Sequence, residues 1–154
     1  MEINNEILIA FSYCPYKAFL KSKHQNGILS EYEILYNQLK QNQKCRYEET
    51  LLSRNQLISI NSSFDSKIQR RGIVLNFKFS NQNINLMLDG IEFENKYTVP
   101  IFVTPFENVT NYDKKLIAMQ SYYIKKEFNI HIDKCKVIYG KFLNQTKLRV
   151  SFSV

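Results

Sequence analysis

The spacing of apolar residues along the chain predicts a helical first part. Residues 30–54 repeat apolar side chains every three or four positions, as an amphipathic helix does, and Ser30 and Glu33 have the spacing of a capping box. Before them, residues 4–22 show a looser helical spacing that Pro15 interrupts, which favours a short turn and then a helix beginning at Pro15. The apolar stripe of the longer helix is predicted to contain Tyr32, Leu35, Tyr36, Leu39, Tyr47, Leu51 and Leu52.

From Gln56 onward the spacing changes to the alternation of β-strands. Residues 72–80 and 84–94 flank a short polar segment, Asn81-Gln82-Asn83, which predicts a β-hairpin. Further strands are expected over residues 96–105, 135–143 and 146–154. Thr110 or Asn111 would begin a helix between them, with a buried face of Leu116, Met119, Tyr123 and Ile124 and with Ile117 and Phe128 at its edges.

This order of elements predicts one mixed α/β domain over residues 1–154. Residues 1–55 form its helical N-terminal part, and residues 56–154 form a sheet with one crossover helix. The strand–helix–strand unit from Val99 to Tyr139 should be a right-handed crossover. A chain of 154 residues has the usual size of a single domain with a real core.

Composition excludes several classes of protein. Hydrophobic residues make up 44% of the chain and aromatic residues 14%, far from a disordered composition. No apolar run has membrane-spanning length and no signal peptide is recognisable, so a cytoplasmic protein without membrane contact is expected. The three cysteines, Cys14, Cys45 and Cys135, form no Cys-x-x-Cys pair, which excludes a zinc ribbon and favours reduced, mostly buried thiols.

Charge points to a polyanionic partner without requiring one. The net charge is +7, and residues 56–154 carry most of the basic excess. Basic residues near aromatic rings are candidates for nucleic-acid binding, although lysine-rich solvated faces have the same appearance. These candidates are Lys67, Arg70, Arg71, Lys114, Lys125 and Lys126.

Asp89 is the main candidate for chemistry, since it stands among apolar residues of a predicted strand and a buried charge without a partner is costly. A strand carboxylate followed by an acid and a lysine on the next strand makes a magnesium nuclease site. Glu92 stands three residues later, on the opposite face of a regular strand unless a bulge at Gly90 redirects one side chain. Alternatively, Asp89 begins a turn and Glu92 is solvated.

Several segments resemble, in order, the RecB-like branch of the PD-(D/E)XK nuclease superfamily, in particular nucleases related to the CRISPR-associated RecB-like exonucleases. They are SYCPYKAFLK, LDGIEFENKYTVPIFVTPFENVTNYDKKLIAMQSYYI and CKVIYGK. The resemblance implies a restriction-endonuclease-like fold, in which helices flank a mixed central sheet. It also implies catalytic roles for Asp89 and Gln120, and the family's first metal acid corresponds to Asp89. Together with Glu92 from the strand spacing, the expected ligands of Mg²⁺ or Mn²⁺ are therefore Asp89 and Glu92.

The chain departs from the pattern of this family at important positions. The acid and lysine of the next strand would fall near Phe102 and Thr104, and Ile124 occupies the tyrosine position of the family's Gln-x-x-x-Tyr helix motif. A replacement acid would have to come from Glu48, Glu49 or Glu107, and a replacement lysine from Lys96 or Lys114. An iron–sulfur cluster is not expected, because no cysteine group follows Cys135.

The sequence therefore predicts a degenerate nuclease fold that binds nucleic acid, DNA in preference, with weak or no cleavage. One alternative is an active magnesium-dependent DNA exonuclease or endonuclease that uses a displaced acid. Another is a protein-interaction module of a larger DNA-processing or CRISPR-type defence assembly.

Overall fold

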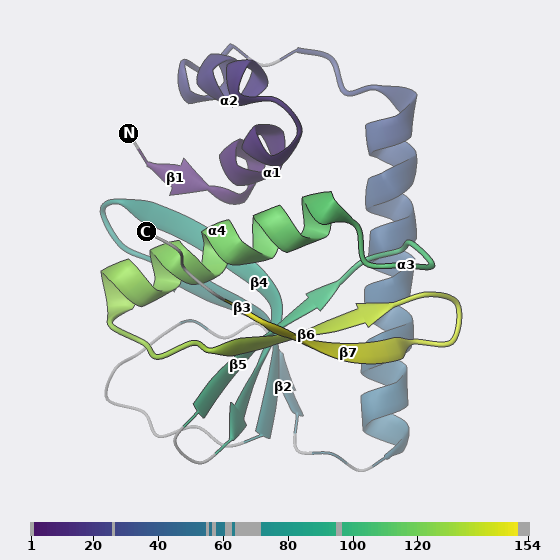
Figure 1. Ribbon diagram of the computed structural model, residues 1–154. Coiled ribbons are helices and arrows are strands. Elements are labelled where there is room, and N and C mark those ends of the chain that lie inside the picture. The colour runs from purple at the N-terminus through teal and green to yellow at the C-terminus, as the bar shows by residue number, and fades with distance from the viewer. Residues whose placement is uncertain are drawn as a thin grey trace.

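A mixed sheet lies between helices in the computed structural model (Figure 1). The structure describes residues 2–25, 27–54, 56, 58–60, 63, 72–94 and 97–150. The helices are α1 (Asn5–Tyr13), α2 (Pro15–Ser22), α3 (Glu31–Ser53) and α4 (Asn111–Phe128). The strands are β1 (Ile3–Asn4), β2 (Ile58–Ile60), β3 (Gly72–Ser80), β4 (Ile84–Glu94), β5 (Tyr97–Val103), β6 (Lys134–Tyr139) and β7 (Asn144–Arg149).

The described strands follow the order β2-β3-β4-β5-β6-β7, with β1 beside β4. β3 and β4 form the predicted antiparallel hairpin, and the side chain of Asn81 accepts the N–H groups of Asn83 and Ile84 in its turn. β5 and β6 are parallel and are connected through α4. The mixed α/β class predicted from the sequence is thus confirmed.

Each face of the sheet has its own hydrophobic core. On one face, Ile117 and Ile124 of α4 pack with residues of β3, β4 and β6, among them Phe77 and Leu88. On the other face, Tyr47 and Leu51 of α3 pack with residues such as Leu75, Ile101 and Val103. We refer below to these two sides as the α4 face and the α3 face.

Only part of the predicted stripe of α3 is buried. Tyr47 and Leu51 lie against the sheet, whereas Tyr32, Leu35, Leu39 and Leu52 are exposed. Figure 1 shows the reason: the first half of α3 extends beyond the strands, alongside α1 and α2. Helical spacing identifies the apolar stripe of a helix but not how much of its length a sheet covers.

The N-terminal turn expected before Pro15 is instead the helix α1. The side chain of Asn4 accepts the N–H of Ile7 at 3.0 Å and caps this helix. The Cys14 N–H closes its last turn on Ala10, and Pro15 then begins α2. Pro15 therefore separates two helices, because a proline fits the first position of a helix.

The capping residues of α4 fit the predicted start, but its buried face is rotated from the expected one. Thr110 and Asp113 form a capping box, and the helix ends at Asn129 in the left-handed conformation, with φ of 52°. Ile117 and Ile124 are buried, while Leu116, Met119 and Tyr123 are half-buried. Among the helices of the described residues, none combines the length and apolarity needed to cross a membrane.

Candidate functional site

Asp89 lies where β4 separates from β5. The β4–β5 ladder runs from Glu94 opposite Tyr97 to Gly90 opposite Ile101 and then stops. Beyond this point β5 pairs with β6, and the first residues of β4 pair with β1. The Val103 N–H donates to Oδ2 of Asp89 at 2.8 Å. The carboxylate thus satisfies a β5 amide just past the end of the ladder.

Two lysines of α3 neutralise this carboxylate. Nζ of Lys40 lies 3.0 Å from Oδ2 of Asp89, and Nζ of Lys44 lies 3.4 Å from Oδ1. The lysines are four residues apart, so they lie on neighbouring turns of the same side of the helix. The Asp89 side chain is 9% exposed, and those of Lys40 and Lys44 are 26% and 21% exposed. The acid that the sequence left without a partner is therefore paired with both.

Opposing effects act on the pKa of Asp89. Burial alone would raise it, because removing water disfavours the charged carboxylate. The ammonium groups of Lys40 and Lys44 and the Val103 N–H outweigh burial and lower the pKa below its ordinary value. The side chain is consequently ionised at neutral pH and forms part of a charged cluster.

Asn76 of β3 completes this cluster. Its side-chain oxygen accepts a hydrogen bond from Lys44 at 2.8 Å. Asn76 stands opposite Asp89, and the two residues form the one gap in an otherwise continuous β3–β4 register. The φ angle of Asn76 is 51°, a left-handed conformation that asparagine tolerates better than most residues.

The interruption at Asn76 places Asp89 and Glu92 on the same face. Leu88 and Ile91 both belong to the core on the α4 face, so the strict alternation of β4 is broken between them. Asp89 points toward α3, and Glu92 lies opposite Ile73, which belongs to the core on the α3 face. The irregularity anticipated at Gly90 is therefore present, and it involves both strands of the hairpin.

Glu92 nevertheless has its own cationic partner. Its carboxylate accepts a hydrogen bond from Lys136 of β6 and forms an ion pair with it. Burial, together with the negative charge of Glu92, raises the pKa of Tyr47 to about 12, so that phenol remains neutral. The two predicted metal ligands thus belong to two separate ion pairs.

Strand β5 contributes no charged side chain beside Asp89. Ile101 and Val103 belong to the core on the α3 face, and Phe102 packs into the core on the α4 face. Thr104 is buried, and its N–H donates to Ile138 of β6. Neither of the positions expected to supply an acid and a lysine, Phe102 and Thr104, does so.

Gln120 lies on the other side of the sheet from Asp89. It is buried on α4, and its Nε2 donates to Oδ1 of Asn5 at 3.3 Å. Asn5 in turn bonds the backbone of Met87 through both of its side-chain polar atoms. The structure therefore does not bring the two predicted catalytic residues together, and Gln120 connects α4 to α1 and to the start of β4.

The residues around Asp89 do not fit a divalent cation. Mg²⁺ and Mn²⁺ require several oxygen ligands, whereas both oxygens of Asp89 already face ammonium groups. Among the described residues, no group of three or more histidine, cysteine, aspartate or glutamate side chains could hold a metal ion. Among the proposed replacements that the structure describes, Glu48 alone lines the small pocket at Asp89, and Lys44 lines it too.

The other proposed replacements lie elsewhere or outside the described residues. Glu49 is exposed on α3. Glu107 approaches the backbone of Lys141, and Lys114 lies on α4. Lys96 is outside the described residues. The cysteines also differ from expectation, since Cys135 is buried but Cys14 and Cys45 are exposed.

The structure describes only some of the residues predicted to bind nucleic acid. Lys114, Lys125 and Lys126 are exposed on α4, whereas Lys67, Arg70 and Arg71 lie outside the described residues. The sequence reasoning missed a second basic group on β6 and β7. The signal was present in the alternating segments Lys134-Cys135-Lys136 and Lys147-Leu148-Arg149, which place two basic side chains of each strand on one face.

No protein-family model matches this chain, and no curated protein matches it as a relative.

Proposed function

We propose that this chain is a nucleic-acid-binding domain with a RecB-like nuclease fold that does not cut its substrate efficiently. The observation that carries the proposal is the pairing of Asp89 with Lys40 and Lys44. A carboxylate held by two ammonium groups and a backbone N–H has no oxygen free for a metal ion. A cation would first have to displace both lysines, and the described residues hold no group of three or more potential metal ligands that would offset that cost.

The basic surface of the molecule supports the binding half of the proposal. The net charge is +7, and exposed lysines on α4 are joined by a second basic group on β6 and β7. Phosphate groups are the general partner of such surfaces, because lysine and arginine release condensed counterions from the nucleic acid. The order of strands and helices is compatible with a nuclease-like sheet, and the resemblance of the sequence segments favours DNA.

The direct experiment incubates the protein with single-stranded and double-stranded DNA in the presence of Mg²⁺ or Mn²⁺. A salt-sensitive gel shift without cleavage is the expected result. Metal-dependent cleavage that disappears in Asp89→Ala would overturn the proposal in favour of an active nuclease. The absence of any shift at low salt would instead favour a protein-interaction module.

A further inference from the structure

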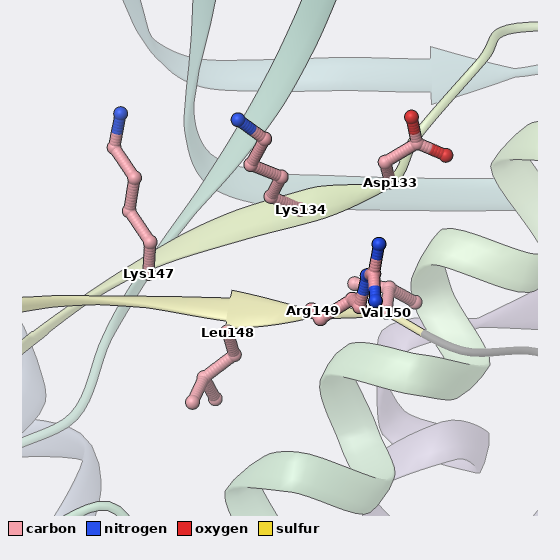
Figure 2. A pocket seen from close by; sticks show the side chains of 6 residues that line it. All are labelled: Asp133, Lys134, Lys147, Leu148, Arg149 and Val150. Carbon is pink, nitrogen blue, oxygen red and sulfur yellow. The ribbon is translucent and has the colours of Figure 1, made fainter.

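Four basic residues occupy one face of the β6–β7 hairpin in two cross-strand pairs. Lys134 stands opposite Arg149, and Lys136 stands opposite Lys147. Cys135 and Leu148, which lie between them along the strands, pack on the α4 face. The four basic side chains therefore share the α3 face. Figure 2 shows Lys134 and Lys147 on one side of the hairpin and Leu148 on the other.

Such an arrangement is unfavourable in the isolated protein, because like charges directly opposite each other on a sheet repel. Two acids of β4 offset the repulsion within one of the two pairs, because Glu92 forms an ion pair with Lys136 and Glu94 lies 3.7 Å from Lys147. Among the described residues, no carboxylate forms an ion pair with Lys134 or Arg149. Both of these side chains are exposed, so within the described residues this cross-strand pair has no acidic side chain to compensate its two charges.

These charges line a pocket on the surface of the hairpin (Figure 2). Lys134, Lys147 and Arg149 supply its cationic groups, and Asp133 is its one acidic residue among those described. Oδ2 of Asp133 also lies 2.8 Å from Nε2 of His131. The pocket is therefore predominantly positive and suits the oxygens of a phosphate group.

Protection of an exposed sheet edge does not explain the whole pattern. Lysines on an edge strand prevent pairing with other chains, and this would account for Lys147 and Arg149 on β7, the last strand in the described order. Lys134 and Lys136, however, lie on β6, which is paired on both sides. Glu92 accounts for Lys136, whereas Lys134 forms no ion pair with a carboxylate of the described residues, and its position suits a ligand of opposite charge.

We propose that this face of the β6–β7 hairpin binds the phosphate backbone of DNA through Lys134, Arg149 and Lys147. This inference rests on the proposed nucleic-acid-binding function. It places the DNA contacts on the α3 face of the hairpin, on the other side of the sheet from the lysines of α4. Backbone contacts of this kind are insensitive to base sequence and strongly sensitive to salt.

The test compares two double variants with the same change in net charge. Lys134→Gln/Arg149→Gln alters the hairpin, and Lys114→Gln/Lys126→Gln alters α4 on the other side of the sheet. Binding to labelled single-stranded and duplex DNA is measured by fluorescence anisotropy over a range of salt concentrations. For duplex DNA, loss of two phosphate contacts should reduce the slope of log affinity against log salt by about 1.8. The α4 variant should reduce the slope by less than the hairpin variant does.

Thermal unfolding distinguishes lost contacts from lost structure. The hairpin variant should unfold at or above the wild-type temperature, because the substitution removes a repulsive pair. Equal losses in both variants, or a loss confined to the α4 variant, would overturn the assignment but leave the proposed function standing. A wild-type protein that does not bind DNA even at low salt would overturn both.

Discussion

The ammonium of Lys40 lies 3.0 Å from the same Asp89 oxygen that accepts the Val103 N–H at 2.8 Å. One carboxylate oxygen thus joins helix α3 to strand β5 at the point where β4 leaves the ladder. Together with the contact of Lys44, this pairing gives Asp89 a structural role: it fixes α3 against the sheet and satisfies a backbone amide that has lost its ladder partner.

Replacing Asp89 should destabilise the protein strongly. Asp89→Ala leaves two ammonium groups and one backbone N–H without their acceptor, and removing one partner of a largely buried ion pair costs about 3 kcal/mol. Urea unfolding followed by circular dichroism measures the loss. Glu49→Ala, at an exposed position of the same helix, is the control and should change stability by less than about 0.5 kcal/mol. Equal stability of Asp89→Ala and wild type would contradict the structural role.

Acid should weaken the protein partly through Asp89. Its pKa is lowered in the folded state, so its contribution is complete above the ordinary aspartate pKa of about 3.9 and is lost as pH falls toward the folded-state pKa. Glu33, whose pKa the hydrogen bond from Lys17 helps lower to about 2, acts in the same range. The difference in unfolding free energy between wild type and Asp89→Asn isolates Asp89 and should shrink from about pH 5 to about pH 2.

Gly90 and Gly27 provide a matched pair of substitutions. A Cβ at Gly90 would lie 3.1 Å from Cδ2 of Leu75 and 3.2 Å from the Val74 carbonyl oxygen, whereas a Cβ at Gly27 meets nothing within 4 Å. Gly90→Ala should therefore cost about 1–3 kcal/mol through overpacking. Gly27→Ala should be neutral or slightly stabilising, because it restricts the unfolded chain. Similar unfolding midpoints for the two variants would disagree with the packing at the hairpin.

At Asn76, a glycine variant should be more stable than an alanine variant, which is the reverse of the order expected at an ordinary strand position. Both Asn76→Gly and Asn76→Ala remove the acceptor for Lys44, but only glycine adopts a φ of 51° without steric cost. Asn76→Ala should therefore be less stable than Asn76→Gly by about 1 kcal/mol. Chemical denaturation of the two variants provides the comparison, and a more stable alanine variant would show that the left-handed conformation is not retained.

The order of elements could be predicted from the sequence because it depends on local spacing. Alternation and turn chemistry located the β3–β4 hairpin, and capping residues located the starts of α3 and α4. The partners of Asp89 could not be predicted in this way. Lys40 and Lys44 lie more than forty positions away in the chain and read as solvated residues of a helix. Only the packing of α3 across the sheet brings them to the carboxylate.

The separation of Gln120 from Asp89 has the same origin. Both residues belong to elements that were predicted correctly, yet the face of the sheet on which α4 packs is set by tertiary contacts. The shared face of Asp89 and Glu92 required knowing that Asn76 interrupts the alternation. Periodicity describes a regular strand and does not predict such an interruption.

Manganese binding tests most directly whether Asp89 is an ion-paired structural residue instead of a metal ligand. Crystals of the wild-type protein would be soaked in Mn²⁺, and the anomalous signal of manganese would locate any bound ion. No anomalous peak is expected at Asp89, and its pairing with Lys40 and Lys44 should be intact. A peak within about 2.2 Å of the Asp89 carboxylate, with further protein oxygens around it and the two lysines displaced, would instead identify Asp89 as a metal ligand.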